Sequence, residues 1–182
     1  MAKGLPFFGL FLLFALLNPS PSGAIAPGDT IPPFTVVFPG KDGDKLLTAN
    51  DLLGYVTVLF YDTRHTAPTN NDLKYAIRDF QKANLPVSAS LMVVQIIDAS
   101  SANVFTRTIW KRKIRENAKR YGIPIYADWT GAMRRDFDFS PKESNILIVD
   151  PKGVVRFAFQ GNPQGEDWER LFKVLHSLIE AT

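Results

Sequence analysis

The sequence predicts one α/β domain with a mixed central β-sheet and helices on both faces. Two almost continuously apolar runs, residues 55–61 and 91–97, are rich in β-branched and aromatic side chains, as is typical of strands covered on both faces. A helical spacing of apolar residues follows each run, which is the order of parallel strand-helix units. Two further short strands about a turn at residues 150–153, and a last amphipathic segment, predict an antiparallel hairpin and a closing helix.

The elements can be assigned in chain order from their patterns and their end signals. Pro68 opens a helix in which Leu73, Ile77 and Phe80 recur at helical spacing, and Gly122 ends the next helix. Residues 40–44 read as the turn that reverses the first strand, and residues 150–153 as the turn of a hairpin. The expected strands are residues 34–38, 55–61, 91–97, 123–126, 146–149 and 154–159, and the expected helical segments are 50–53, 68–84, 104–121, 131–137 and 168–179.

The first residues have the pattern of a secretory signal peptide. Lys3 precedes an apolar run at residues 5–17, which is short for a bilayer span. Small and turn-forming residues follow, and cleavage after Ala24 places Ser22 three residues before the cut. We therefore expect a signal peptide at residues 1–24, with an uncleaved anchor as the alternative, and a folded domain at residues 25–182. This predicts export, to a bacterial periplasm or to the medium.

The chain contains no cysteine, which excludes thiol exchange and thiol-based reduction of peroxides. The fold must therefore rely on its hydrophobic core, without the disulfides that exported proteins often use. Removing the signal peptide lowers the formal net charge from +3 to +2, with 20 basic against 18 acidic residues. Such a small excess gives no reason to expect nucleic acid as a partner, and we expect no cofactor.

Two stretches of the chain resemble known patterns, beginning with the loop at residues 60–72. This loop is similar to the peroxiredoxin loop between the central strand and the next helix, in which a Thr stands three residues before the reactive Cys. In that register Thr66 keeps the Thr position and Thr69 occupies the Cys position. Matched instead to the Cys-x-x-Cys loop of thioredoxins, the two Cys positions fall on His65 and Pro68. Both registers leave the nucleophile missing.

The second stretch, residues 145–155, resembles the hairpin that follows the cis-proline in the thioredoxin superfamily. Ser144 stands nearest the proline position, and Pro141 lies farther back. Over essentially the whole mature region the chain resembles the YtfJ-type periplasmic thioredoxin-like family. The resemblance implies a thioredoxin-like fold and a periplasmic location, and it implies no reaction. The features that carry it are Asp98 at a strand end, residues 125–131 and the turn at residues 150–153.

Acidic residues fall at the carboxyl ends of predicted strands, where ligands usually meet a parallel sheet. Asp62, Asp98 and Asp128 end three strands, and His65 follows in the loop after the first. If Asp62, His65 and Asp98 converged, they could hold a divalent cation or support acid-base chemistry. Aspartates at strand ends more commonly cap the next turn, so we expect capping and no metal site.

The loop after the first buried strand also contains hydroxyl groups beside a histidine. Thr63, Thr66 and Thr69 are possible nucleophiles with His65 as the base, but neighbouring positions alone do not establish that geometry. We expect instead that Thr66 or Thr69 caps the following helix. The unpaired N–H groups where that helix begins predict a weak pocket for an anion or a carboxylate.

The helix predicted at residues 104–121 is strongly basic between residues 107 and 120. Trp110, Ile114 and Tyr121 belong to the stripe that it buries. We expect its charges to form a solvated outer face, and the alternative is contact with an acidic partner or weak contact with an anionic membrane.

Three functional hypotheses follow. The first is a redox-inactive binding module that holds a peptide or partner protein in a groove at residues 63–69. The second is a metal-binding or acid-base enzyme built on Asp62, His65 and Asp98. The third, a peroxiredoxin-like antioxidant protein, follows only from the resemblance and is contradicted by the missing cysteine. The residues expected opposite the loop, on the other side of the groove, are Ser140, Pro141, Ser144 and Asn145.

Overall fold

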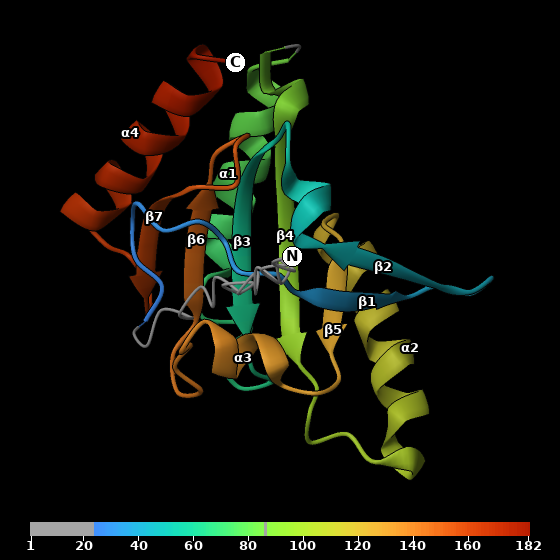
Figure 1. Ribbon diagram of the computed structural model, residues 1–182. Coiled ribbons are helices and arrows are strands. Elements are labelled where there is room, and N and C mark those ends of the chain that lie inside the picture. Colours follow the sequence, from blue (N-terminus) through green and yellow to red (C-terminus); the bar gives the residue numbers. More distant parts are fainter. Residues whose placement is uncertain (1–23, 86) are drawn as a thin grey trace, which may run out of the picture.

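The computed structural model describes residues 24–85 and 87–182, so the predicted signal peptide, apart from Ala24, lies outside the described residues. The strands form one mixed sheet in the order β2-β1-β5-β4-β3-β6-β7 (Figure 1). The strands are β1 (Thr35–Pro39), β2 (Asp44–Thr48), β3 (Val56–Asp62), β4 (Leu91–Asp98), β5 (Ile125–Asp128), β6 (Asn145–Val149) and β7 (Val155–Gln160). The helices are α1 (Asn71–Ala83), α2 (Val104–Tyr121), α3 (Ala132–Asp136) and α4 (Glu166–Glu180), with 3-10 turns η1 (Ala49–Leu52) and η2 (Val87–Ser90).

The central strands β3 and β4 are parallel and run in register from Val56 beside Leu91 to Asp62 beside Ile97. On the other side of β3, β6 pairs antiparallel and continues into the hairpin with β7. β5 is parallel to β4, and the β1-β2 hairpin completes the sheet. The expected mixed α/β sheet is therefore confirmed, and the carboxyl ends of β3, β4 and β5 meet at one edge.

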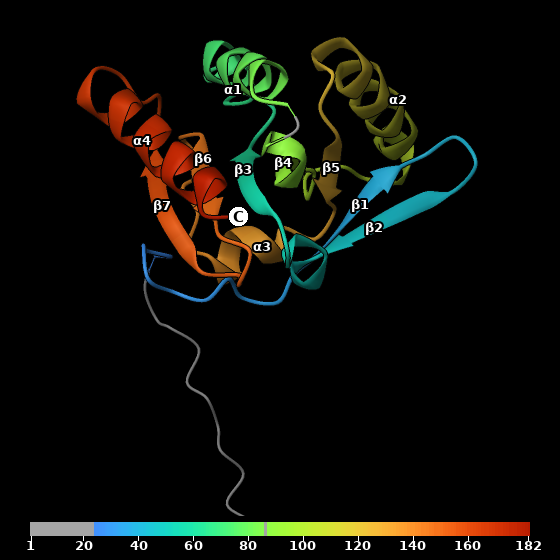
Figure 2. The same cartoon turned by 90° about the horizontal axis from the view of Figure 1, so that it is seen from above.

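Helices cover both faces of the sheet, as predicted, but the long ones share one face. In Figure 2, α1, α2 and α4 lie along one side of the sheet, whereas α3 lies on the opposite side. The even-numbered residues of β3, such as Val58, pack with Leu73 of α1 and Leu175 of α4. The odd-numbered residues, such as Leu59, pack with Met133 of α3. This alternation is the two-residue period of a strand buried on both faces.

β2 was not among the strands expected from the sequence, and several element bounds differ from the prediction. The two clearest shifts are at β5 and at the start of α1. The strand predicted at residues 123–126 runs instead from Ile125 to Asp128, where it pairs with β4. Pro124 has no N–H to donate, and its carbonyl accepts the N–H of Gln95 just before the ladder begins. The helix predicted from Pro68 begins at Asn71, because residues 66–70 form turns instead.

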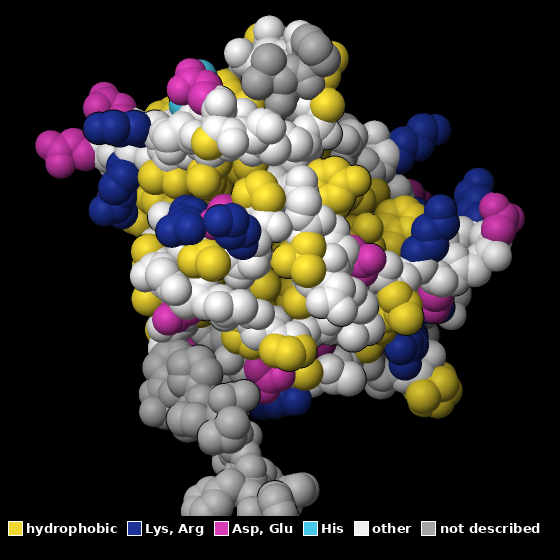
Figure 3. All heavy atoms as spheres, turned by 45° about the horizontal axis from the view of Figure 1, so that its top comes forward, with side chains coloured by type: hydrophobic (Ala, Val, Ile, Leu, Met, Phe, Trp, Pro, Cys, Tyr) yellow, Lys and Arg dark blue, Asp and Glu magenta, His cyan; other side chains and the backbone are white. Residues whose placement is uncertain are grey.

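The surface is mixed rather than dominated by one class of side chain. On the face shown in Figure 3, hydrophobic side chains lie in several groups among polar atoms, with lysines, arginines and acidic residues between them. Scattered apolar side chains of this kind are ordinary on a protein surface. Among the described residues, no helix has the length and apolar character needed to cross a membrane.

Candidate functional site

A buried ion pair lies at the end of β3, beneath the loop that resembles a redox site. The Nζ of Lys74 on α1 lies 3.2 Å from Oδ2 of Asp62, and the two side chains are only 2% and 0% exposed. Gln95 of β4 donates its amide N–H to the same carboxylate oxygen at 2.6 Å. The carboxylate at the predicted position is thus held by a cation and an amide, neither of which was predicted from the sequence.

The ion pair also ties the loop to α1. Lys74 donates a second hydrogen bond from Nζ to the carbonyl oxygen of Ala67 at 2.8 Å, and Nζ lies 5.1 Å from the centre of the Phe60 ring. Burial lowers the pKa of Lys74 below its usual value, although the Asp62 carboxylate acts in the opposite direction. The loop is therefore anchored from below by a buried charge pair.

Two sequence signals could have revealed these partners. Lys74 lies next to Leu73 and three residues before Ile77, which places it on the apolar face of α1. Gln95 is the one polar side chain within the apolar run of β4 before Asp98. A polar residue in each of two buried positions indicates a buried polar contact.

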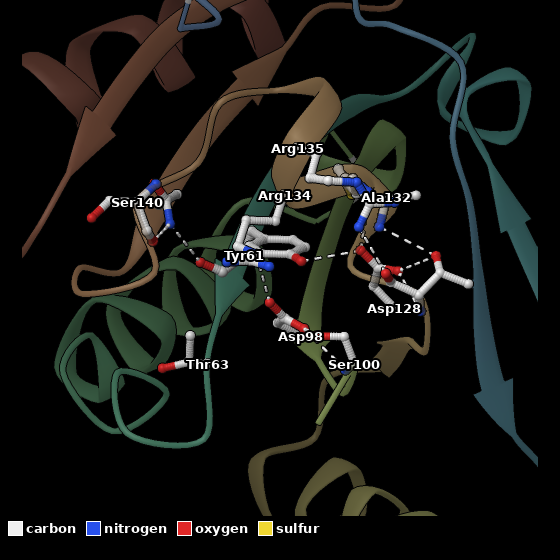
Figure 4. A network of polar contacts seen from close by, with 12 residues as sticks. Tyr61, Thr63, Asp98, Ser100, Asp128, Ala132, Arg134, Arg135 and Ser140 are labelled. Carbon is white, nitrogen blue, oxygen red and sulfur yellow. Dashed lines mark hydrogen bonds and ion pairs between the residues drawn. The ribbon is translucent and has the colours of Figure 1, made fainter. Parts of the chain in front are cut away.

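Asp98 and Asp128 form a separate polar network on the other face of the sheet (Figure 4). Asp98 accepts hydrogen bonds from Ser100 and lies 3.0 Å from Nε of Arg134 on α3. Asp128 accepts the hydroxyl of Tyr61 at 3.1 Å. The backbone N–H groups of residues 130 and 133 also donate to Asp128. Both aspartates therefore position α3 and its preceding turn, as the capping interpretation expects.

The phenol of Tyr61 is part of this network. Burial, together with the carboxylates of Asp128 and Asp98, raises the pKa of Tyr61 far above its usual value. Tyr61 therefore stays protonated and donates its hydrogen bond to Asp128 throughout the physiological pH range.

The alternation of side chains separates the aspartates that the sequence placed at one edge. Asp62 pairs with Ile97 across the β3-β4 ladder, so the two side chains share the face covered by α1 and α2. Asp98 is one residue further along β4 and points to the opposite face, the face that it shares with its neighbour Asp128. Strand ends alone could not reveal this separation.

The hypothetical cluster of Asp62, His65 and Asp98 is therefore not assembled. Asp62 is enclosed with Lys74, Asp98 faces Arg134, and His65 is exposed in the loop. In the part of the chain that the structure describes, no three His, Cys, Asp or Glu side chains lie together as metal ligands would.

The threonines of the loop stabilise the loop itself. The side chain of Thr66 accepts the N–H of Thr63 at 2.9 Å, and the N–H of Thr69 donates to the carbonyl of Thr66. The expectation that Thr66 or Thr69 caps α1 is wrong, because the N-cap residue is Asn70. The Asn70 amide makes no cap hydrogen bond and donates instead to the carbonyl of Gly161 at 2.9 Å.

The predicted second wall of the groove is held against β3 by Asn145. Its Nδ2 donates to the carbonyl of Tyr61, and its Oδ1 accepts the N–H of Ser140. Ser144 is fully buried and accepts the N–H of Gly161 through its carbonyl, whereas Pro141 is exposed. This loop lies with Tyr61 on the α3 side of the sheet edge.

A cavity of about 460 Å³ lies on the opposite face. It lies between α2 and the loop within residues 60–72 that resembles a redox site, here called the redox-type loop. Its floor is formed by Gln95 and Ile97 of β4 and Ile125 of β5, and Ala67 and Pro68 bring the loop to its edge. None of residues 140–145 lines it. The side chains of α2 that complete the wall are Thr106, Ile109, Trp110, Lys113, Ile114, Asn117 and Tyr121, and Arg64 adds a further charge from the loop.

The fold and the site together define a thioredoxin-like domain with no thiol at the redox position. Residues 45–178 match the family described as bacterial protein of unknown function (YtfJ_HI0045), and the chain belongs to this family. The resemblance drawn from the sequence is thereby confirmed. No curated protein matches the sequence.

Solved structures share the fold at low sequence identity. A protein from Bacteroides thetaiotaomicron, assigned as a protein disulfide isomerase, is similar with a TM-score of 0.65 and 16% identity, over 86% of this chain and 91% of that chain. A protein from Chlorobium tepidum, assigned as the thiol:disulfide interchange protein DsbE, has a TM-score of 0.59 and 16% identity, over 86% and 99% of the chains. The mitochondrial 2-cys peroxiredoxin of Plasmodium falciparum has a TM-score of 0.57 and 14% identity, over 86% and 95%.

Proposed function

We propose that this chain is an exported, redox-inactive binding module that holds a segment of a partner protein in the cavity beside the redox-type loop. The observation that carries the proposal is the cavity of about 460 Å³, which lies within the usual size range of ligand sites and has a largely apolar lining. Thiol chemistry is excluded because the chain has no cysteine, whereas a binding surface needs none.

A polypeptide segment fits the surroundings of the cavity better than a small molecule. Beside the cavity, the first turns of α2 expose Val104 and Phe105, which are 85% and 89% accessible, and Ile109 is 47% accessible. Phe105 lies one helical turn before Ile109, which lines the cavity, so the apolar surface continues outward along α2. A small ligand would leave this surface in water, but a longer apolar segment covers it together with the cavity.

The contacts of Ile25 favour one of two possible cleavage sites for the proposed signal peptide. Ile25 donates its N–H to the carbonyl of Phe137 and packs against the core formed with α3. A signal peptidase cut after Ala24 leaves this residue in the mature chain, whereas a cut after Ala26 removes it. Cleavage after Ala24 therefore keeps a residue whose backbone and side chain the domain uses.

The test is a thermal-shift screen of the full chain against a library of short peptides. A peptide that binds only the folded protein at a hundred times its Kd stabilises it by about 2.7 kcal/mol, which raises the Tm by roughly 5–10 °C for a domain of this size. Asn117→Trp places a bulky side chain at the exposed rim of the cavity and is expected to abolish the shift.

Lys119→Trp is the matched control, because Lys119 is exposed on the same helix and does not line the cavity. It is expected to leave the peptide-induced shift unchanged. A library without any stabilising peptide, or a shift that survives Asn117→Trp, overturns the proposed function.

A further inference from the structure

We infer that the cavity selects an acidic amphipathic segment, in which an apolar side chain enters the cavity and carboxylates pair with Arg64 and Lys113 at its rim. This inference deepens the proposed function and rests on it. It names the chemistry of the partner segment: large apolar residues alternating with Asp or Glu.

The rim of the cavity is positively charged. Arg64 comes from the redox-type loop and Lys113 from α2, and both line the cavity while being exposed to solvent. Within residues 24–85 and 87–182, no acidic side chain lines the cavity. Among the described residues, no carboxylate lies within ion-pair distance of either cation, whereas Lys111 pairs with Asp44 and Arg112 with Glu116 on the same helix. The rim therefore presents two cations that have no acidic partner within the described part of the chain.

The inner surface of the cavity is largely apolar. Ile97, Ile114 and Ile125 are buried beneath it, and Trp110 forms part of its wall. A hydrophobic side chain that enters leaves water and contacts this surface, while charged groups of the same segment remain at the rim. Apolar contact at the centre with charge pairs at the edge is the usual arrangement of a protein interface.

The net charge of α2 argues against a second copy of this chain as the occupant. Between residues 104 and 121 the helix contains seven Lys and Arg residues and the single acidic residue Glu116. Two such helices brought face to face repel each other, whereas an acidic segment is attracted. Complementary charge thus selects a partner of opposite sign.

Fluorescence polarisation with three labelled synthetic peptides tests the inference on the full chain. The peptides share one pattern of Leu and Trp residues and differ only at the intervening positions, which are all Glu, all Gln or all Lys. We expect the Glu peptide to bind at least about tenfold tighter than the Lys peptide, and this preference to decrease with added salt.

Charge-reversal variants test whether Arg64 and Lys113 cause the preference for the Glu peptide. Lys113→Glu is expected to weaken binding of the Glu peptide by about threefold to tenfold, and Arg64→Glu to do the same. Lys119→Glu makes the same charge change on α2 away from the cavity and is expected to change the affinity by less than about twofold. Phe105→Ser is expected to weaken all three peptides alike, because it removes apolar contact and no charge.

The other possible outcomes of these binding measurements distinguish failure of the acidic selectivity from failure of the proposed binding function. If the three peptides bind equally and Lys113→Glu has no effect, the proposed binding function stands and the acidic selectivity is wrong. If none of the peptides binds, both proposals fail. If 3-phenylpropionate binds as tightly as the Glu peptide and Phe105→Ser leaves its affinity unchanged, the site accepts a small carboxylate and the inference of a peptide segment is overturned.

Discussion

At the residue scale, the pair Asp62 and Lys74 holds the redox-type loop in place. Both side chains are almost completely buried, and the carboxylate has further donors in Gln95 and Thr66. A buried ion pair is not by itself a large source of stability, because both charges lose their hydration. Removing one partner is costly, however, since the remaining charge stays buried without compensation.

This asymmetry gives a double-mutant prediction. Lys74→Met is expected to lower the free energy of unfolding by about 3–5 kcal/mol, because it leaves the Asp62 charge buried. Adding Asp62→Asn is expected to recover most of that loss, since the neutral amide needs no cation. Urea denaturation measures all three free energies. A double variant less stable than Lys74→Met would contradict this account of the pair.

A second carboxylate, Asp150, stabilises the turn between β6 and β7. It accepts the N–H groups of Lys152 and Val154 and a pair of contacts from the Arg156 guanidinium. Burial acts to raise the pKa of Asp150, but the N–H of Val154 and the Arg156 guanidinium outweigh it and lower the pKa. The stabilisation is therefore complete above the ordinary value of 3.8 and is lost as the pH falls through the lower folded-state pKa.

Replacing this carboxylate should thus have a pH-dependent effect. Asp150→Asn is expected to reduce the free energy of unfolding by about 1.5–3 kcal/mol at neutral pH, because hydrogen bonds to a charged group are lost. The difference from the natural chain should shrink as the pH falls below 3.8. Urea denaturation over a pH series checks this. Asp42→Asn, in an exposed turn, should show no such change.

At the element scale, α2 is a helix whose apolar stripe is narrow and whose ends are well defined. Asn103 caps its start by accepting the N–H of Thr106, and Gly122 ends it in the left-handed conformation with a φ of 69°. Ile114 is its one buried residue among those described. The helix therefore depends on its caps more than a deeply packed helix does.

The N-cap provides a direct test of that dependence. Asn103→Ala is expected to lower the free energy of unfolding by about 1 kcal/mol, since Thr106 loses its acceptor. Asn103→Asp, which keeps an acceptor at the positive end of the helix dipole, should preserve the stability or increase it. Equal losses in the two variants, measured by urea denaturation, would show that the cap is not the cause.

The basic face of α2 also bears on membrane contact. Several of its charges have structural partners, as when Lys111 pairs with Asp44 and Arg115 donates to the carbonyl of Pro39. We expect only weak binding to phosphatidylglycerol vesicles, lost in high salt. Reversing Arg112, Lys113 and Arg120 to Glu should abolish what remains in a cosedimentation assay. Unchanged binding of this triple variant would exclude α2 as the contact.

At the scale of the whole molecule, the expected leader precedes a domain in which Ile25 donates its N–H to the carbonyl of Phe137. If the leader is a cleaved signal peptide, mass spectrometry of the periplasmic fraction should find a chain of residues 25–182. Leu12→Arg places a charge inside the apolar run and should leave the uncleaved chain, residues 1–182, in the cytoplasm. A full-length natural chain in the periplasm would instead indicate an uncleaved leader.

Much of the architecture could be predicted from the sequence, because local patterns report burial and chain reversal. The apolar runs predicted β3 and β4, and the helical spacing with Gly122 predicted the bounds of α2. The absence of cysteine excludes thiol chemistry whatever the fold. These properties depend on residues near one another in the chain or on composition alone.

Only the tertiary structure decided which side chains meet. Asp62 pairs with Ile97 and not with Asp98, so the Asp98 side chain points to the opposite face of the sheet. This pairing depends on the register of β3 against β4. Register also joins Asp62 to Gln95, and the packing of α1 on the sheet brings Lys74 to the same carboxylate. The cavity lies between a loop and a helix more than thirty residues apart in the sequence. Contacts of this kind depend on long-range packing, which no local pattern in a single sequence records.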